Sequence, residues 1–164
     1  GEVYCRLYHE LYGLETVALR YFNVFGPRQD PKSEYAAVVP RFATACLRGE
    51  PAQINGDGEQ SRDFTFVADT VRANLLAADA PAAVGQVINV AGGRRISLNA
   101  LLAALQEITG SKVAAVHGPG RAGDVRHSLA DLGRARTLLG FEPEVSLAEG
   151  LRRTVESLRG SATP

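Results

Sequence analysis

The sequence predicts an α/β fold in which helices cover parallel strands. Residues 16–24 and 86–91 are almost continuously apolar, which is typical of strands that are buried on both faces of a parallel sheet. The segments between and after them repeat apolar side chains at helical spacing. A length of 164 residues suits one domain, and a composition of 45% apolar and 22% charged residues is that of a globular chain.

The charge balance excludes several classes of partner. Eighteen Lys and Arg residues cancel eighteen Asp and Glu residues, so the chain has no overall field that would attract nucleic acid or a membrane surface.

Cys5 and Cys46 are isolated, so their spacing indicates neither a disulfide framework nor a zinc site. Because we find no signal peptide and no long apolar run, we expect a cytoplasmic protein.

The first predicted element is a helix at residues 2–12. Val3, Leu7 and Leu11 share one of its faces, and Gly13 is its C-terminal stop. The sequence begins inside this helix without an N-terminal cap, so we expect the chain to be truncated there.

The strand at 16–24 leads to a turn where a ligand is expected. Gly26 permits a sharp turn and Pro27 cannot donate to a ladder, so the strand stops there. Asn23 then lies at the carboxyl end of the strand, which is where open α/β sheets bind their ligands. The alternative is that Asn23 only caps the turn.

The remaining elements follow from periodicity and from capping residues. A helix is predicted at about 39–48 with Pro40 in its first turn, where a missing N–H costs nothing. Asp69 is the expected N-cap of a helix that continues to about residue 80. Ser97 and Ser146 cap two further helices. The other expected elements are strands at 53–55 and 62–67 around a turn at 56–58, a strand at 112–116, and helices at 132–139 and 147–158.

Four blocks carry a family resemblance, in order and at family-like spacing. They are RYFNVFGPRQDP at residues 20–31, YAAVVPRF at 35–42, INGDGEQSRDF at 54–64 and RAGDVRHSLAD at 121–131. The chain resembles the extended short-chain dehydrogenase/reductases, and most of all the UDP-sugar 4-epimerases among the NAD-dependent nucleotide-sugar epimerases and dehydratases. The resemblance covers essentially the whole chain.

The resemblance implies the C-terminal, substrate-binding part of an extended Rossmann-type fold. The N-terminal dinucleotide-binding βαβ units, with their Gly-rich loop and the catalytic Tyr-x-x-x-Lys pair, are absent from this sequence. Residues 1–34 and 84–96 resemble parts that complete the sheet of the cofactor domain, and residues 35–83 and 97–164 resemble the substrate domain. We therefore predict no catalytic residue and no cofactor for this chain, although full-length relatives use NAD.

The candidate site residues are ones that suit a nucleotide diphosphate. Guanidinium groups are permanently charged and bind phosphate through two donors, which makes Arg62 and Arg121 candidates, although the sequence alone favours an ordinary surface arginine at each position and only the resemblance reverses this. By resemblance, these two arginines and Asn23 contact the diphosphate. The resemblance further implies that Asp124 binds the ribose, Asn55 contacts the base or ribose, and Ala37, Val38 and Phe42 lie along the base.

Two other patterns carry no site. Residues 118–123 match the dinucleotide expression G-x-G-x-x-G, but Pro119 lacks an N–H and Asp124 would repel phosphates, so we interpret them as a loop. A metal site built from His127, Asp124 and Asp131 has no support from spacing, and we predict none.

Two functions of different classes remain. In the first, the chain is the nucleotide-sugar-binding half of a truncated UDP-sugar 4-epimerase-like enzyme, or half of a dehydratase or decarboxylase. In the second, it is a non-catalytic nucleotide-sugar-binding or oligomerising module. Strands with unpaired apolar edges invite pairing, so we expect a homo-oligomer through residues 1–24, most simply a dimer.

Overall fold

A computed structural model describes residues 1–30 and 37–160 of the chain. The start of the YAAVVPRF block, Tyr35 and Ala36, lies outside the described residues. The elements are α1 (Glu2–Tyr12), β1 (Ala18–Tyr21), β2 (Val24–Phe25), α2 (Val38–Arg48), β3 (Ala52–Asn55), β4 (Ser61–Asp63), β5 (Thr65–Phe66), α3 (Val67–Ala78), the 3-10 helix η1 (Pro81–Ala83), β6 (Val87–Val90), β7 (Arg95–Ser97), α4 (Leu98–Thr109), β8 (Ala115–Gly118), α5 (Gly133–Leu139) and α6 (Leu147–Gly160).

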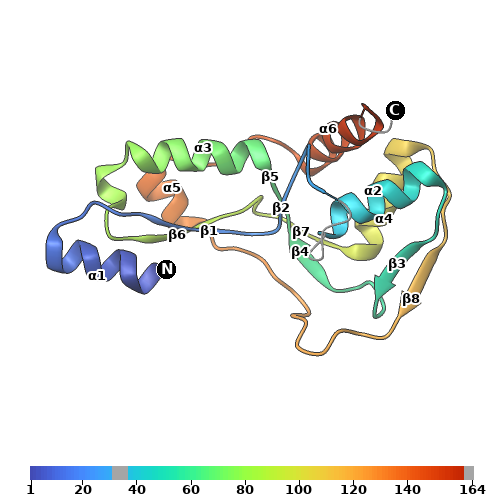
Figure 1. The fold of residues 1–164 in the computed structure, drawn as a ribbon, viewed down its shortest axis with the longest axis horizontal. Coiled ribbons are helices and arrows are strands. Elements are labelled where there is room, and N and C mark those ends of the chain that lie inside the picture. The colour runs from blue at the N-terminus through green and yellow to red at the C-terminus, as the bar shows by residue number, and fades with distance from the viewer. Residues whose placement is uncertain (31–36, 161–164) are drawn as a thin grey trace.

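The molecule is elongated, with two lobes joined by short central strands (Figure 1). One lobe contains α1, α3 and α5 around β1 and β6, and the other contains α2, α4 and α6 beside β3 and β8. Strands β2, β4, β5 and β7 lie between the lobes. The mixture of helices with parallel strand pairs confirms the predicted α/β class.

The strands form four two-stranded ladders. Three are parallel, namely β1–β6, β2–β5 and β3–β8, and β4–β7 is antiparallel. The turn at 56–58 therefore does not join two paired strands, because the strands on either side of it pair with β8 and β7. Ala52 and Ile54 of β3 are buried, so this strand is held by core packing as well as by its ladder.

The predicted strand at 16–24 is two strands, and the prediction of one buried strand is wrong. Asn23 has a φ of 37°, which breaks the extended backbone, so β1 pairs with β6 and β2 pairs with β5. Strand β1 is also not buried on both faces, since Leu19 is half-buried and Tyr21 is exposed. Its partner β6 carries the buried side chains of this ladder, Ile88 and Val90.

Local capping signals were predicted correctly at several helix ends. Helix α1 ends at Gly13, whose φ of 68° is left-handed, as the sequence predicts. The Ser97 hydroxyl accepts a hydrogen bond from the Ala100 N–H at 3.2 Å. The Ser146 hydroxyl accepts one from the Glu149 N–H, also at 3.2 Å. Each bond satisfies a backbone donor that the first turn of a helix leaves without an internal partner.

The Asp69 prediction needs correction. Helix α3 begins two residues earlier, at Val67, so Asp69 lies inside the first turn and is not the N-cap. Its side chain is almost fully buried, and its two oxygens accept hydrogen bonds from the N–H groups of Glu144 at 3.0 Å and Val145 at 3.1 Å. Asp69 therefore fastens α3 to the segment that precedes α6, a long-range role that no local pattern indicates.

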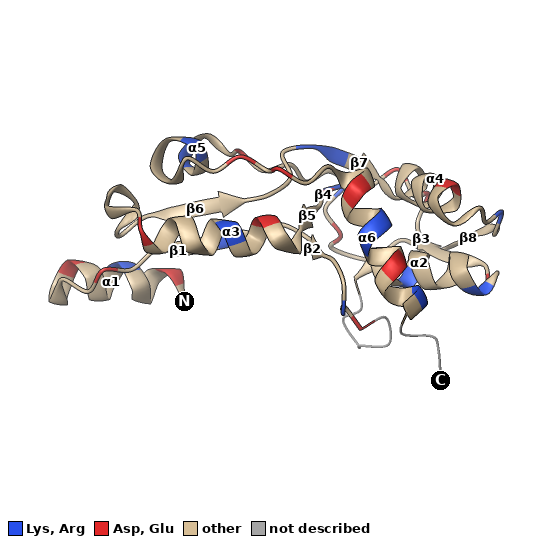
Figure 2. Cartoon of the chain, turned by 90° about the horizontal axis from the view of Figure 1, so that it is seen from above, with Lys and Arg blue, Asp and Glu red and all other residues tan. Residues whose placement is uncertain are grey.

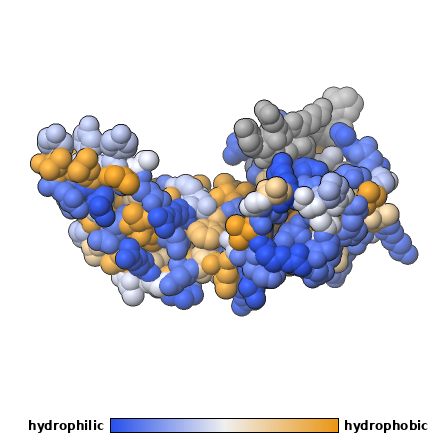
Figure 3. Space-filling view, turned by 90° about the horizontal axis from the view of Figure 1, so that it is seen from below, coloured by the Kyte–Doolittle hydropathy of each residue, from blue (hydrophilic) through white to orange (hydrophobic). Residues whose placement is uncertain are grey.

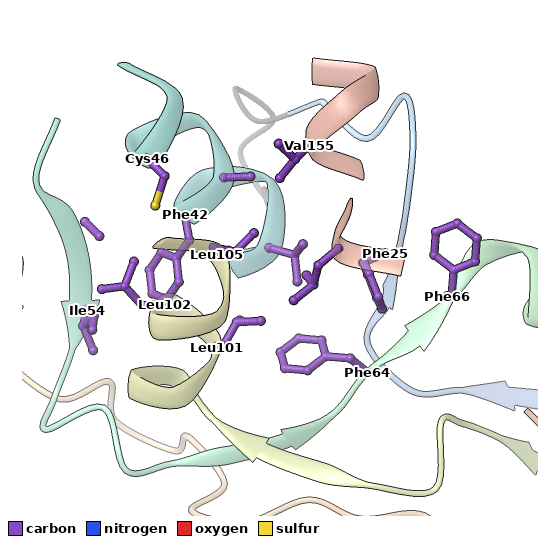
Figure 4. Close-up of a cluster of buried hydrophobic side chains, with 14 residues drawn as sticks. Phe25, Phe42, Cys46, Ile54, Phe64, Phe66, Leu101, Leu102, Leu105 and Val155 are labelled. Carbon is purple, nitrogen blue, oxygen red and sulfur yellow. The ribbon is translucent and has the colours of Figure 1, made fainter. Parts of the chain in front are cut away.

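Two hydrophobic cores correspond to the two lobes. The larger packs α2, α4 and α6 on β3 and the central strands (Figure 4). The smaller joins β6 to α3 and α5 through buried side chains that include Ile88, Ala73 and Leu139. The resemblance assigns residues 35–83 and 97–164, which include α3 and α5, to the substrate domain. In the structure both helices pack in the same core as β6, because their apolar faces cover this ladder.

Acidic and basic residues alternate along α6 in the cartoon of Figure 2. On that helix, Glu149 bonds Arg153 at 2.7 Å and also pairs with Arg152. Within residues 1–30 and 37–160, no helix has both the length and the apolar composition needed to cross a membrane.

The contact of α6 with the central strands generates a prediction about Gly150. A methyl group placed on Gly150 would stand 2.8 Å from the rings of Phe25 and Phe66, closer than carbon atoms pack. We expect Gly150→Ala to lower the free energy of unfolding by about 1–3 kcal/mol, measured by urea denaturation, although alanine favours a helix.

Gly160 provides the control, because it lies on the same helix and no atom of residues 1–30 or 37–160 lies within 4 Å of such a methyl group. Gly160→Ala should leave the stability unchanged or raise it slightly. If Gly150→Ala were as stable as the parent, α6 would not pack on these rings as described.

Candidate functional site

A polar pocket of about 260 Å³ lies where the parallel strands β3 and β8 end together. Asn55 at the end of β3 is in register with Gly118 at the end of β8, and loops continue from both strands. Ligands of α/β proteins bind at such carboxyl ends. The pocket is lined by Asn55, Gly56, Asp57, Gln60, Gly120, Arg121, Asp124 and Arg126.

Four of the predicted site residues come together here. Asn55, Arg121 and Asp124 line the pocket directly. Arg62, on β4, reaches it through a hydrogen-bonded ion pair from its Nη2 to Asp124 Oδ1, and its Nη1 donates to the Ser61 carbonyl at 2.9 Å. The Arg62 side chain is only 16% exposed, so its guanidinium is held by protein contacts on several sides.

A second ion pair joins two residues of the pocket lining. Arg126 donates through Nη1 and Nη2 to the two carboxylate oxygens of Asp57, each at 2.8 Å. The Glu59 N–H also donates to Asp57, at 3.0 Å. The Arg126 hydrogen bonds, with a smaller effect of the Glu59 N–H, lower the pKa of Asp57 from 3.8 to about 2.

Gln60 is a pocket residue that sequence reasoning missed. Its side chain is 93% buried, and Nε2 donates to the Asn55 carbonyl at 2.6 Å, which fixes the end of β3. Its Oε1 is buried and faces no donor within the described part of the chain. The residue stands in the INGDGEQSRDF block, but nothing in its spacing distinguishes it from an ordinary polar residue of a turn.

The other predicted site residues lie outside this pocket lining. The Asn23 amide donates to the carbonyl of Asp63 at 2.8 Å, so its side chain ties the segment after β1 to β4 over 40 positions of the sequence. Ala37 precedes α2 and Val38 begins it, and both are half-buried. Phe42 is 2% exposed and points into the larger core (Figure 4), so we assign it no contact with a base.

In the glycine-rich segment at 118–123, Gly118 is the last residue of β8 and the positions after it form a loop, as predicted. The next helix begins only at Gly133. The dinucleotide fingerprint requires a helix to begin at the motif, so this segment does not have its geometry. Of the three histidines, His117 lies 2.9 Å from the Gly56 carbonyl and His127 lies 2.9 Å from the Ser61 hydroxyl. In the described ranges, no cluster of three or more His, Cys, Asp or Glu residues could hold a metal ion.

Comparisons with known proteins agree on one family. The profile described as "NAD dependent epimerase/dehydratase family" matches residues 1–91. A UDP-glucose 4-epimerase of Mycolicibacterium smegmatis is 43% identical over 162 residues, which are 99% of this chain and 51% of that protein. A UDP-N-acetyl-alpha-D-glucosaminuronate decarboxylase of Bacillus cytotoxicus is 32% identical, over 92% of this chain and 48% of that protein.

A solved structure gives the same picture. The UDP-glucose 4-epimerase of Thermotoga maritima, crystallised with UDP-glucose, superposes with a TM-score of 0.94 at 47% identity. The match covers 99% of this chain and 52% of that protein. The chain thus has the α/β fold of these epimerases and spans about half the length of the relatives that it matches.

The Asp57–Arg126 pair generates a prediction about titration. Since its folded pKa is lowered, Asp57 stabilises the fold above its ordinary pKa, and this contribution is lost as the pH falls through about 2. In Arg126→Gln, we expect the pKa of Asp57, followed by carboxyl NMR, to return toward the ordinary value of about 4.

Arg136→Gln is the control, because Arg136 forms a similarly exposed pair with Glu142 away from the pocket. It should leave the pKa of Asp57 unchanged. A pKa that stays near 2 in Arg126→Gln would show that the backbone of the turn, rather than Arg126, holds the carboxylate ionised.

Proposed function

The chain belongs to the NAD dependent epimerase/dehydratase family, and from this we propose that it supplies the nucleotide-sugar-binding half of a UDP-sugar 4-epimerase-like protein. The observation that carries the proposal is the pocket itself. Asn55, Arg121 and Asp124 line it, and Arg62 is bonded to Asp124 at its edge, although these residues are scattered over 70 positions of the sequence.

The proposed binding mode follows from the chemistry of these side chains. Arg62 and Arg121 are permanent cations with several N–H donors, which match the oxygens of a diphosphate. When Arg62 turns to the phosphates, the carboxylate of Asp124 is released to accept hydrogen bonds from ribose hydroxyls. Asn55, at the end of β3, offers an amide that both donates and accepts, as the edge of a base requires.

The one segment that matches a dinucleotide-binding expression does not fit a nicotinamide dinucleotide. The glycine-rich segment at 118–123 begins no helix, and Pro119 has no N–H to offer to a phosphate. The matching family profile is described as NAD dependent, but we assign no step of hydride transfer to the residues of this chain. Its proposed part is to hold and orient the nucleotide and its sugar.

A second candidate is supported by the decarboxylase relative. At 32% identity, it shows that the same half of the fold occurs in a protein of different named activity, so the chain could equally belong to a decarboxylase or dehydratase. A non-catalytic nucleotide-sugar-binding module is the third candidate, supported by the poor fit of segment 118–123 to a dinucleotide.

A cytoplasmic location stays a prediction, with which the free thiols of Cys5 and Cys46 are compatible.

We also propose that the chain assembles through α1 and β1. Helix α1 has no buried residue, and its Val3, Tyr4 and Leu11 are 72%, 69% and 63% exposed. Figure 3 shows the resulting apolar stripe at one end of the molecule. Beside it, β1 pairs with β6 alone among the described strands. A two-fold dimer that covers this stripe would bury both features.

The binding mode predicts the effect of removing each arginine. We expect Arg62→Ala and Arg121→Ala each to weaken the binding of UDP by about 1.5–3 kcal/mol in calorimetric titration, because each loses charged hydrogen bonds to the diphosphate.

Arg159→Ala, on the exposed last turn of α6, is the control and should bind like the parent. If the parent bound no UDP, or if both pocket variants bound it unchanged, the assignment of the diphosphate contacts would be refuted.

The assembly proposal predicts a dimer at micromolar concentration, measured by multi-angle light scattering. The interface should exceed about 2,000 Å², which is the range of obligate dimers. Because Leu11 lies on the exposed face of α1, Leu11→Glu should place a charge in this interface and shift the measured mass toward that of the monomer. A well-folded monomer of the parent chain would contradict the proposal.

A further inference from the structure

The loop between β8 and α5 decides whether the pocket is formed. It carries Arg121 and Asp124, yet it has no regular structure of its own apart from one bridge between Ser61 and His127. The positions of its two site residues therefore depend on contacts with the rest of the protein.

Backbone hydrogen bonds fasten the two ends of this loop. The Gly56 N–H donates to the Gly118 carbonyl at 2.9 Å on one side. On the other side, the Ser61 N–H donates to the Arg126 carbonyl at 2.9 Å and the Ser128 N–H donates to the Ser61 carbonyl at 3.0 Å. The part in between, which holds the site residues, is attached to β4 through the Arg62–Asp124 ion pair.

That ion pair is a contact for which the proposed ligand competes. A diphosphate bound by Arg62 takes up guanidinium donors that now serve Asp124. The inference therefore rests on the proposed function, in which the bound diphosphate weakens the Arg62–Asp124 ion pair. A second contact must then keep the loop over the pocket.

The Asp57–Arg126 pair has the geometry for this task. Both terminal nitrogens of Arg126 are occupied by Asp57 at 2.8 Å, so the side chain does not offer its fork to a phosphate, although it lines the pocket. Asp57 is itself fixed within its turn by the Glu59 N–H at 3.0 Å. The pair thus joins the β3–β4 turn to the loop across the pocket.

We propose that Asp57 and Arg126 are positioning residues that latch loop 119–126 over the nucleotide pocket and so preorganise Arg121 and Asp124. The latch holds with the ligand absent and persists when Arg62 exchanges Asp124 for phosphate. Preorganisation of this kind raises affinity because the cost of ordering the loop has been met before binding.

The test measures loop protection and affinity in the same variants. In the ligand-free chain, we expect Asp57→Ala and Arg126→Ala each to speed amide hydrogen exchange within residues 119–126 while the rest of the chain keeps its protection. Each should raise the dissociation constant of UDP about two- to five-fold, the effect of losing one exposed ion pair. The double variant should bind UDP no more weakly than the single variant with the lower affinity, because all three variants lose the same contact.

Arg136→Ala serves as the matched control, since the Arg136–Glu142 pair is as exposed as the latch and lies outside the pocket lining. It should alter neither the exchange of the loop nor the affinity. Unchanged exchange in both latch variants would overturn the proposal. So would a loss of affinity confined to Arg126→Ala, which would make Arg126 a direct phosphate ligand. If the parent chain bound no UDP, the proposed function would fail, whereas the exchange rates would still decide whether the latch exists.

Discussion

The buried carboxylate of Asp63 is the point on which the rest of this structure depends. The residue is fully buried at the end of β4, between the two lobes (Figure 1). Burial raises the pKa of its carboxyl, and the facing N–H groups of Ala130 and of residues 92–94 oppose this rise. Its backbone carbonyl accepts the Asn23 amide at 2.8 Å and its Oδ2 accepts the Ala130 N–H at 3.2 Å, so one residue joins the segment after β1 and the segment before α5 to β4.

The pocket depends on this crossing. Arg62 precedes Asp63 on β4, and Ala130, whose N–H reaches the Asp63 carboxylate at 3.2 Å, ends the loop that carries Arg121 and Asp124. A buried carboxylate is costly unless it accepts hydrogen bonds, so the bond from the Ala130 N–H favours the position of this segment against β4. The site is therefore assembled from distant segments, which the contacts of Asp63 hold beside β4 and which the ion pairs of Arg62 and Arg126 join at the pocket.

The sequence predicted interactions between near neighbours along the chain better than interactions between distant residues. The caps at Gly13, Ser97 and Ser146 involve neighbours within a few residues, so local patterns predicted them correctly. Arg62, Arg121 and Asp124 were identified through family resemblance, and the structure places them together. Other contacts join positions more than 60 residues apart, and one sequence carries no signal for them. They are the bonds from Asp69 to residues 144 and 145, the pairing of β3 with β8, and the Asp57–Arg126 contact. The break at Asn23 was missed because an apolar run does not reveal a left-handed residue.

We propose that this chain carries a preformed nucleotide-diphosphate site at the ends of β3 and β8. Titration of the ¹⁵N-labelled chain with UDP, followed residue by residue in NMR spectra, tests this most directly. We expect shifts to concentrate at residues 55–62 and 121–126, while β1 and β6 stay unchanged. Shifts centred on β1 and β6, or no shifts at millimolar UDP, would contradict it.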